Sequence, residues 1–271
     1  DYWERNLYNG ILAQQNPETG MVAYFLPLQA GSIKVWGTPT HDFWCCHGSL
    51  VQAHTIYGNH VYYENDAGLV VSQYIPTELT WQWNGAPVTV RQTFDTEASM
   101  PGPRTPDGET HRPNRWTVEF SVYTERPATF ALQMRVPWWT VGEARVWVNG
   151  EAQSVAASPS SFLSLQRTWQ GSDTVRVEFP KGLWSSPLPD APDTVAFMDG
   201  PLVLAGLCDE ERVLVGDKAH PETLLTPDNE REWWFWRQGY RAHGQTRGLR
   251  FIPLYEVQDE RYTVYFPVRQ K

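Results

Sequence analysis

The chain has 271 residues, 41% of them hydrophobic, which is enough for one large domain or two modest ones. Asp and Glu outnumber Lys and Arg by 31 to 22, and an acidic chain without a basic stripe makes a poor partner for nucleic acid. No apolar run reaches the roughly 18 residues that span a bilayer, and Asp1–Arg5 does not read as a signal sequence. We therefore expect no membrane partner and a cytoplasmic location. The 14 Trp, 12 Tyr and 11 Phe exclude a disordered chain, and three cysteines exclude a disulfide framework.

The N-terminus is predicted to form an amphipathic helix over Asp1–Gln15. Trp3, Leu7 and Ile11 recur at helical spacing on one stripe, and the segment Asn16–Gly20 then breaks the pattern. A helix with a wide apolar stripe needs other helices to cover it. Because few helical segments follow, we expect the chain to be part of a longer protein.

The next stretch contains a second predicted helix. An apolar segment, Met21–Leu28, is followed by a polar loop, Gln29–Thr40. Helical spacing then returns over Gly48–Gly58, with a glycine at its end.

From Val61 onward the hydrophobic period changes to two, which is typical of strands. The Asn-Gly pairs at 84–85 and 149–150 indicate hairpin turns. Strands are predicted over 68–75, 78–83, 87–94, 116–123, 129–136, 144–148, 162–165, 174–179, 194–198, 202–207, 249–257 and 261–268, with connections over 101–113 and 181–192 and irregular chain over 208–248. The pattern predicts a mainly β fold, an antiparallel β-sandwich over 61–271 that follows a short helical domain over 1–60.

The densest group of chemically active side chains lies between His41 and Gly48. It contains His41, Cys45, Cys46 and His47, and thiols with imidazoles suit zinc. The two cysteines also come just before the predicted helix, and a helix N-terminus favours thiolate. The alternative is that they are buried and inert, because zinc motifs usually separate their cysteines by two residues.

Several blocks of the sequence occur together, and in this order, in one known family. They are Leu7–Gly10, Phe43–Cys46, Tyr74–Glu78, Leu132–Trp139, Val148–Glu151, Arg167–Asp173, Asp199–Ala205, Pro253–Tyr255 and Arg261–Tyr265. Over these blocks the chain resembles the C-terminal half of glycoside hydrolase family 127, the β-L-arabinofuranosidase family.

This resemblance implies an (α/α)6 barrel followed by β-sandwich domains, of which residues 1–60 would be the last barrel helices. It further implies that Cys45 is the nucleophile of a retaining glycosidase and a zinc ligand, and that Cys46 is a second zinc ligand. The other two ligands would be a Glu and a Cys from an upstream Glu-x-Cys motif, and a separate upstream Glu would be the acid/base. A retaining glycosidase needs a nucleophile and a proton donor on either side of the anomeric carbon.

The sequence departs from the family pattern in three ways. It contains no Glu-x-Cys motif; Cys208 follows an apolar strand and reads as a buried structural thiol; and His47-Gly48 stands where studied members have two prolines. Because two ligands are missing, we expect substoichiometric zinc and little activity from the chain alone.

Other residues have both a functional and a structural interpretation. Trp36, Trp44 and His47 flank the cysteines and are candidate substrate contacts, and His41 is a further candidate ligand, although a hydrogen-bonding or surface histidine is commoner. The carboxylates nearest the pair in sequence are Glu4, Glu18 and Glu64, and solvated surface roles are commoner for such groups.

Two tryptophan clusters are candidate carbohydrate platforms. They are Trp138-Trp139 and the segment 233–236, and packing in the core or between domains is the alternative for both.

The leading hypothesis is a fragment of a glycoside hydrolase that acts on a carbohydrate substrate. Its possible protein partners are the missing N-terminal barrel or a second copy of the chain. The alternatives from other classes are a non-catalytic carbohydrate-binding β-sandwich and a structural or oligomerising module.

Overall fold

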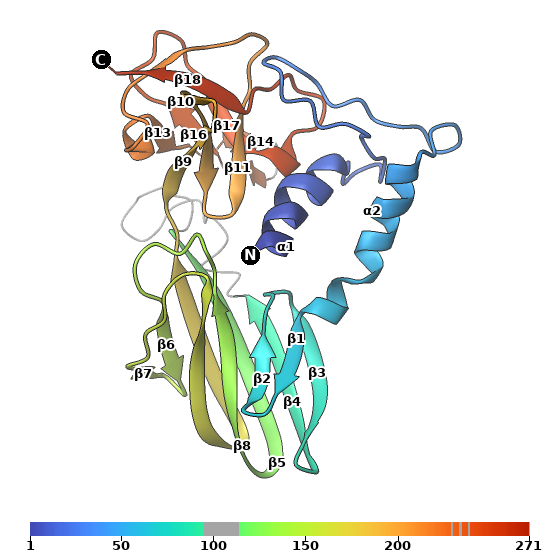
Figure 1. Ribbon diagram of the computed structural model, residues 1–271, viewed down its shortest axis with the longest axis vertical. Helices are drawn as coiled ribbons and strands as arrows, with labels where there is room; N and C mark the ends of the chain where they lie inside the picture. The colour runs from blue at the N-terminus through green and yellow to red at the C-terminus, as the bar shows by residue number, and fades with distance from the viewer. Residues whose placement is uncertain (95–113, 229, 233–234, 238, 271) are drawn as a thin grey trace. The chain divides into compact units, whose positions relative to one another are not determined.

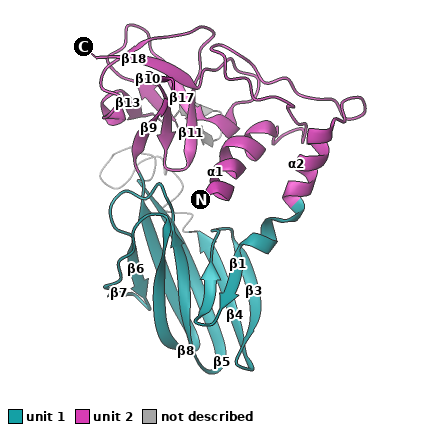
Figure 2. Cartoon of the chain, in the orientation of Figure 1, with its two compact units in different colours: residues 1, 55–100, 113–181 teal, residues 2–54, 101–112, 182–271 magenta. Residues whose placement is uncertain are grey.

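The computed structural model describes residues 1–94, 114–228, 230–232, 235–237 and 239–270 (Figure 1). The chain divides into two units (Figure 2). The described parts of unit 1 are residue 1 and residues 55–94 and 114–181, and those of unit 2 lie in 2–54 and 182–270. The predicted boundary near residue 60 lies close to a unit boundary, while the region predicted as one sandwich domain, 61–271, is shared between the two units.

The N-terminal helix of unit 2 changes its winding along its length. It runs through α1 (Tyr2–Asn6), the π-helical η1 (Leu7–Ile11) and the 3₁₀-helical η2 (Leu12–Gln14). Asn9, in the π-helical turn, donates from its Nδ2 to Pro201 O at 2.8 Å, and its Oδ1 accepts from Val203 N at 2.8 Å. These hydrogen bonds join the predicted helix to residues 201–203, which come more than 190 positions later in the chain.

The second helix, α2 (Cys45–Thr55), begins earlier than the apolar spacing predicts. The Nδ1 of His47 accepts a hydrogen bond from the backbone N of Trp44 at 3.1 Å, which satisfies one of the free N–H groups at the helix start. Cys45 and Cys46 are therefore inside the first turn of α2. A 3₁₀ turn, η3 (Tyr57–His60), follows in unit 1.

Unit 1 is built on one branched sheet. Its path is β1-β2-β5-β8-β6-β7, with β4 joined to β5 and β3 to β4. The strands are β1 (Tyr62–Asn65), β2 (Gly68–Val71), β3 (Thr77–Trp83), β4 (Ala86–Phe94), β5 (Arg115–Val136), β6 (Arg145–Val148), β7 (Glu151–Gln153) and β8 (Ser161–Pro180). Both predicted Asn-Gly hairpin turns are confirmed, and all four of their residues have positive φ. All pairings are antiparallel except β2 with β5.

Two long strands, β5 and β8, form the centre of unit 1. Each replaces two predicted short strands. In β5 the residues between the two predicted strands belong to the strand as well, and its pairing with β8 shifts register between Thr124 and Ala128. Trp169 is fully buried here, stacks near Phe130 with ring centroids 5.5 Å apart, and donates from its Nε1 to Phe130 O at 3.0 Å. The bulge explains why alternation is lost there although the strand continues.

Unit 2 contains the second sheet, in the order β12-β18-β10-β11-β17-β16-β13, with β9 joined to β10. Its strands are β9 (Leu183–Leu188), β10 (Ala191–Asp199), β11 (Leu202–Gly206), β12 (Leu214–Val215), β13 (Leu225–Pro227), β16 (Tyr240–Ala242), β17 (Arg250–Pro253) and β18 (Tyr265–Arg269), with 3₁₀ turns η4 (Pro221–Thr223) and η5 (Leu254–Glu256). A separate hairpin pairs β14 (Glu230–Glu232) with β15 (Phe235–Arg237).

The prediction of a plain connection over 181–192 is wrong, because β9 lies there. Pro187 argued against a strand in the sequence, because proline lacks the N–H that a central strand needs. The strand can form because β9 lies at an edge and pairs with β10 alone. The predicted irregular region 208–248 likewise contains three short strands of the main sheet. The predicted loop over 101–113 falls outside the described residues.

The mainly β fold class is confirmed: the described residues form two eight-stranded sheets, one two-stranded sheet and few helices. No helix among the described residues has the length and apolar character needed to cross a membrane.

Candidate functional site

The cysteine pair opens α2 with both thiols free. Cys45 is exposed, Cys46 is half-buried, and their Sγ atoms lie 3.9 Å apart. Two sulfurs bound to one tetrahedral zinc at about 2.3 Å would be separated by about 3.8 Å. The spacing therefore fits two thiolates on a single zinc. Among the described residues, no group of three His, Cys, Asp or Glu side chains is placed to hold a metal.

A tyrosine that the sequence did not single out contacts both thiols. Hydrogen bonds to Cys46 and Cys45 raise the pKa of Tyr24 to about 12, so its hydroxyl stays protonated at neutral pH. Trp44 packs edge-on against Tyr24, with ring centroids 5.4 Å apart. Tyr24 lies in the predicted apolar segment, and nothing in the local pattern distinguishes it from its neighbours.

Cys45 opens onto a cavity of about 960 Å³ within unit 2. The lining residues come from the segment before α2, from α2 itself and from the C-terminal region: Tyr24, Phe25, Pro27, Gln29, Ala30, Gly31, Ser32, Ile33, Val35, Trp44, Cys45 and Arg261. The side chain of Phe25 is 74% exposed and that of Trp44 is 45% exposed. A free thiol at the edge of a cavity with aromatic walls is an arrangement that suits a small organic ring as ligand.

The segment that lines the cavity is fastened by residues more than 200 positions away. Tyr262, fully buried, donates from its hydroxyl to Pro27 O at 2.8 Å and from its backbone N to Ser32 O at 2.9 Å. Arg261 donates from Nη1 to Gly31 O at 2.9 Å. Donors in the C-terminal region therefore form hydrogen bonds with backbone carbonyl groups of the segment, and these bonds hold the predicted polar loop in one conformation.

Lys34 also holds this segment in place through hydrogen bonds. Its side chain is buried, and its Nζ donates to Leu254 O at 2.8 Å and to Val257 O at 2.6 Å. Burial lowers the pKa of Lys34 to about 8, partly offset by the charge of Glu260. At neutral pH the ammonium group is still mostly protonated, which lets it donate both bonds.

This pKa predicts a pH-dependent stability. Between the folded value of about 8 and the unfolded value of 10.5, the unfolded chain binds more protons, so the unfolding free energy should rise with pH across that window. Lys34→Met should flatten this rise, because the titrating group is gone. Urea unfolding at several pH values from 7.5 to 10 measures the effect. The control Lys218→Met, at a half-exposed position of unit 2, should keep the wild-type slope, and an equally steep slope in Lys34→Met would contradict the expectation.

The predicted substrate contacts Trp36, Trp44 and His47 have different surroundings. Trp44 lines the cavity beside Cys45, whereas neither Trp36 nor His47 is among the described residues that line it. Trp36 donates from its Nε1 to Asp259 Oδ1 at 2.8 Å. His47 is buried, and its Nδ1 accepts a hydrogen bond from the backbone N of Trp44, the residue before α2. His47 therefore positions the start of α2, and its role as a substrate contact stays a prediction.

The other candidate ligands and acids also lie outside the cavity lining. His41 is exposed, with Nδ1 2.8 Å from Thr40 Oγ1. Glu4 is buried in α1 and Glu18 is exposed, while Glu64 belongs to unit 1, where it accepts a hydrogen bond from Trp81. No Asp or Glu is among the described residues that line the cavity.

The remaining candidates are structural where they are described. Cys208 is buried, as predicted, with Sγ 3.2 Å from Thr263 Oγ1. Trp139 is buried and stacks on Trp116 with centroids 5.6 Å apart, and Trp138 packs against the core of unit 1. Of the two interpretations of Trp138 and Trp139, packing in the core is therefore the one that the structure supports. The prediction of a sugar platform at 233–236 falls on positions outside the described residues or with side chains that are not described.

Known structures share this fold. A GH127 β-L-arabinofuranosidase from Geobacillus stearothermophilus T6 has 21% identity and a TM-score of 0.70, a protein described as a glycoside hydrolase has 18% and 0.74, and a GH127 β-arabinofuranosidase has 17% and 0.70. The similarities cover 98–99% of this chain but 45–48% of the others, so the chain spans about half the length of these proteins. No curated protein sequence matches it.

Two family models match the sequence itself. Residues 1–59 match the catalytic domain of GH127 β-L-arabinofuranosidases, and residues 105–181 match the middle domain of the same proteins. The first match includes the cysteine pair and the cavity segment, and the second covers all of β5 to β8. Since both matches fall in one family, the chain belongs to glycoside hydrolase family 127, the β-L-arabinofuranosidase family.

Proposed function

We propose that this chain is the nucleophile-bearing part of a retaining glycoside hydrolase, and that the complete enzyme releases terminal β-L-arabinofuranosyl groups from a carbohydrate. The observation that carries the proposal is the exposed Cys45 thiol at the first residue of α2, opening onto the 960 Å³ cavity. The match of this segment to the GH127 catalytic domain supports the reaction class, and the names of two similar proteins support the sugar.

In the first step the Cys45 thiolate attacks the anomeric carbon of the sugar. A carbon–sulfur bond forms, the glycosidic carbon–oxygen bond breaks, and the departing oxygen takes a proton from a carboxylic acid. In the second step the resulting carboxylate removes a proton from water, whose oxygen displaces the Cys45 sulfur. Two displacements at the same carbon give overall retention. The carboxylic acid would come from outside these 271 residues.

The residues around Cys45 would orient it during both steps. The Tyr24 hydroxyl donates toward the two sulfurs and so directs the thiolate. Trp44 and Phe25 would place the apolar face of the furanose ring and exclude water beside the thiolate.

Zinc fits the same pair of thiols. Cys45 and Cys46 would hold it, because their 3.9 Å separation suits two sulfurs on one ion, and two further ligands would come from outside this chain. When bound, zinc keeps the thiols deprotonated at neutral pH and tunes how readily the sulfur leaves.

The test uses the full-length protein that carries this chain. It should hydrolyse 4-nitrophenyl β-L-arabinofuranoside, and proton NMR of the early reaction should show the β-anomer of free arabinose, since two displacements retain the configuration. The α-L-arabinofuranoside is the control substrate and should react far more slowly. An early α-anomer from the β-substrate would contradict the two-step reaction, and no hydrolysis of it would contradict the proposed sugar. The 271-residue chain alone is expected to show little turnover.

A further inference from the structure

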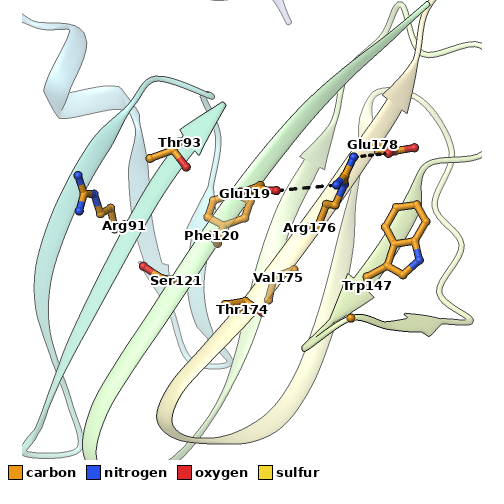
Figure 3. Close-up of a pocket in the computed structure, with 11 residues that line it drawn as sticks. Arg91, Thr93, Glu119, Phe120, Ser121, Trp147, Thr174, Val175, Arg176 and Glu178 are labelled. Atoms are coloured by element: carbon orange, nitrogen blue, oxygen red, sulfur yellow. Dashed lines mark hydrogen bonds and ion pairs between the residues drawn. The ribbon is translucent and has the colours of Figure 1, made fainter. Parts of the chain in front are cut away.

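Unit 1 has a cavity of its own, separate from the Cys45 cavity of unit 2, and the proposed reaction does not use it. It has a volume of about 760 Å³ and lies on the outer face of β4, β5, β8 and β6 (Figure 3). Most of the side chains that line it are polar or charged: Arg91, Thr93, Glu119, Ser121, Thr174, Arg176 and Glu178, together with Trp147. Alternation along each strand turns these side chains away from the core of the unit.

The central row of this face crosses four neighbouring strands in register. Thr93 pairs with Glu119, Glu119 with Arg176, and Arg176 with Trp147. At the usual spacing between strands, the row spans roughly 14 Å, which is the scale of a short oligosaccharide. Figure 3 shows Arg91 and Trp147 on opposite sides of the face, with Glu119 and Arg176 between them.

A cluster of guanidinium groups lies at one end of the face. Glu178 has a side chain only 8% exposed, and it lies 2.8 Å from Arg145, 3.0 Å from Arg176 and 3.6 Å from Arg115. One carboxylate neutralises one of these three cations. Among the described residues, the three guanidinium groups around Glu178 therefore outnumber its single carboxylate.

The rest of the face cancels only part of that charge. Glu119 lies 3.9 Å from Arg176, and the exposed Arg91 adds another guanidinium on β4. Among the described residues of this face, the four arginines 91, 115, 145 and 176 are accompanied by three carboxylates: Glu119, Glu178 and Glu78, the partner of Arg91 across β3 and β4. This leaves an excess of one positive charge on a chain whose net charge is −9. This local charge favours an anionic ligand.

Trp147 adds a flat apolar surface beside these charges. It is half-buried, and the guanidinium carbon of Arg176 lies 6.0 Å from its ring centroid, which restrains the ring. Indole rings stack on the apolar faces of sugar rings, guanidinium groups bind carboxylates, and the hydroxyls of Ser121 and Thr174 suit sugar hydroxyls. A sheet face that only needed to be hydrated would require neither a restrained tryptophan nor a buried carboxylate among three arginines.

We propose that this face of unit 1 binds an acidic oligosaccharide, a short chain of sugar rings that carry carboxylates. Trp147 stacks on a ring at one side of the face, the cluster around Glu178 binds a carboxylate near it, and Arg91 binds a carboxylate of another ring at the opposite side. This binding goes beyond the proposed hydrolysis and does not depend on Cys45.

The test is calorimetric titration of the 271-residue chain with an oligogalacturonate of four to six units. It should bind at least about tenfold more tightly than the neutral galactose oligomer of the same length, and raising the salt concentration should weaken binding. Arg91→Gln should weaken binding by about threefold, as expected for an exposed charge pair, and Trp147→Ala by about tenfold. Arg126→Gln changes an exposed arginine of unit 1 outside the cavity and should leave binding unchanged.

Thermal unfolding of each variant shows whether it is folded, and the exposed position of Arg91 keeps the test valid if Trp147→Ala does not fold. Cys45→Ser should bind the oligogalacturonate like the unaltered chain, which separates this proposal from the proposed reaction. The proposal is overturned if no oligogalacturonate binds, if the neutral oligomer binds equally well, or if Arg91→Gln leaves affinity unchanged. Equal binding of dextran sulfate and single-stranded DNA would also overturn it, since attraction of any polyanion would then be enough.

Discussion

Replacing Cys45 with serine in the full-length protein should lower the turnover of a β-L-arabinofuranoside by at least about a thousandfold, because a neutral hydroxyl is a far weaker nucleophile than a thiolate. The side chain keeps nearly the same size, and Cys45 is exposed at the first residue of α2, so the fold should be unaffected. Steady-state kinetics with the nitrophenyl glycoside measures the loss, and circular dichroism checks the fold. Unchanged turnover in this variant would remove Cys45 from the reaction.

The other two cysteines separate metal binding from nucleophilic attack. Cys46→Ser should lower both the zinc content and the turnover, because one of the two sulfurs 3.9 Å apart is lost. Cys208→Ala should leave both unchanged, since Cys208 is buried beside Thr263. Zinc content is measured by mass spectrometry on each purified protein. Equal zinc in the wild-type protein and in Cys46→Ser would contradict ligation by this pair.

Replacing Tyr262 with alanine should lower the unfolding free energy of unit 2 by about 3–5 kcal/mol, the usual cost of removing a large aromatic side chain from a core. The ring is fully buried, and its hydroxyl bonds to Pro27 O in the segment that lines the Cys45 cavity. Tyr262→Phe keeps the ring and loses only the hydrogen bond, so it should cost about 1 kcal/mol.

The two Tyr262 variants should also differ at the cavity. Alanine is expected to loosen the segment from Tyr24 to Val35 and raise its amide hydrogen exchange, whereas phenylalanine should affect mainly the amides near Pro27. Urea unfolding gives the free energies, and Tyr123→Ala, at an exposed position of unit 1, is the control with little effect on unit 2. A loss below about 1 kcal/mol in Tyr262→Ala would show that this anchor is not needed.

Part of the candidate site was predictable from local sequence. The pair Cys45-Cys46 is conspicuous by its residue types, and the helical spacing over Gly48–Gly58 indicated a helix start nearby. Tyr24 was not predictable, because it lies 21 positions before Cys45 in a segment that reads as ordinary apolar chain. The hydrogen bonds that hold this segment, from Lys34 to Leu254 O and from Tyr262 to Pro27 O, were equally unpredictable, since each joins positions more than 200 residues apart.

The sequence by itself determined the local features whose cause is local. The Asn-Gly pairs imposed their hairpin turns because both residues accept positive φ, and the alternation of side chains set which face of each strand is buried. Only the tertiary structure decided that two predicted pairs of strands are the continuous β5 and β8, that Pro187 lies in an edge strand, and that Thr93, Glu119, Arg176 and Trp147 form one row. Periodicity reports the face that a residue takes but carries no information on its partner, and register across a sheet is fixed by contacts between strands that are distant in sequence.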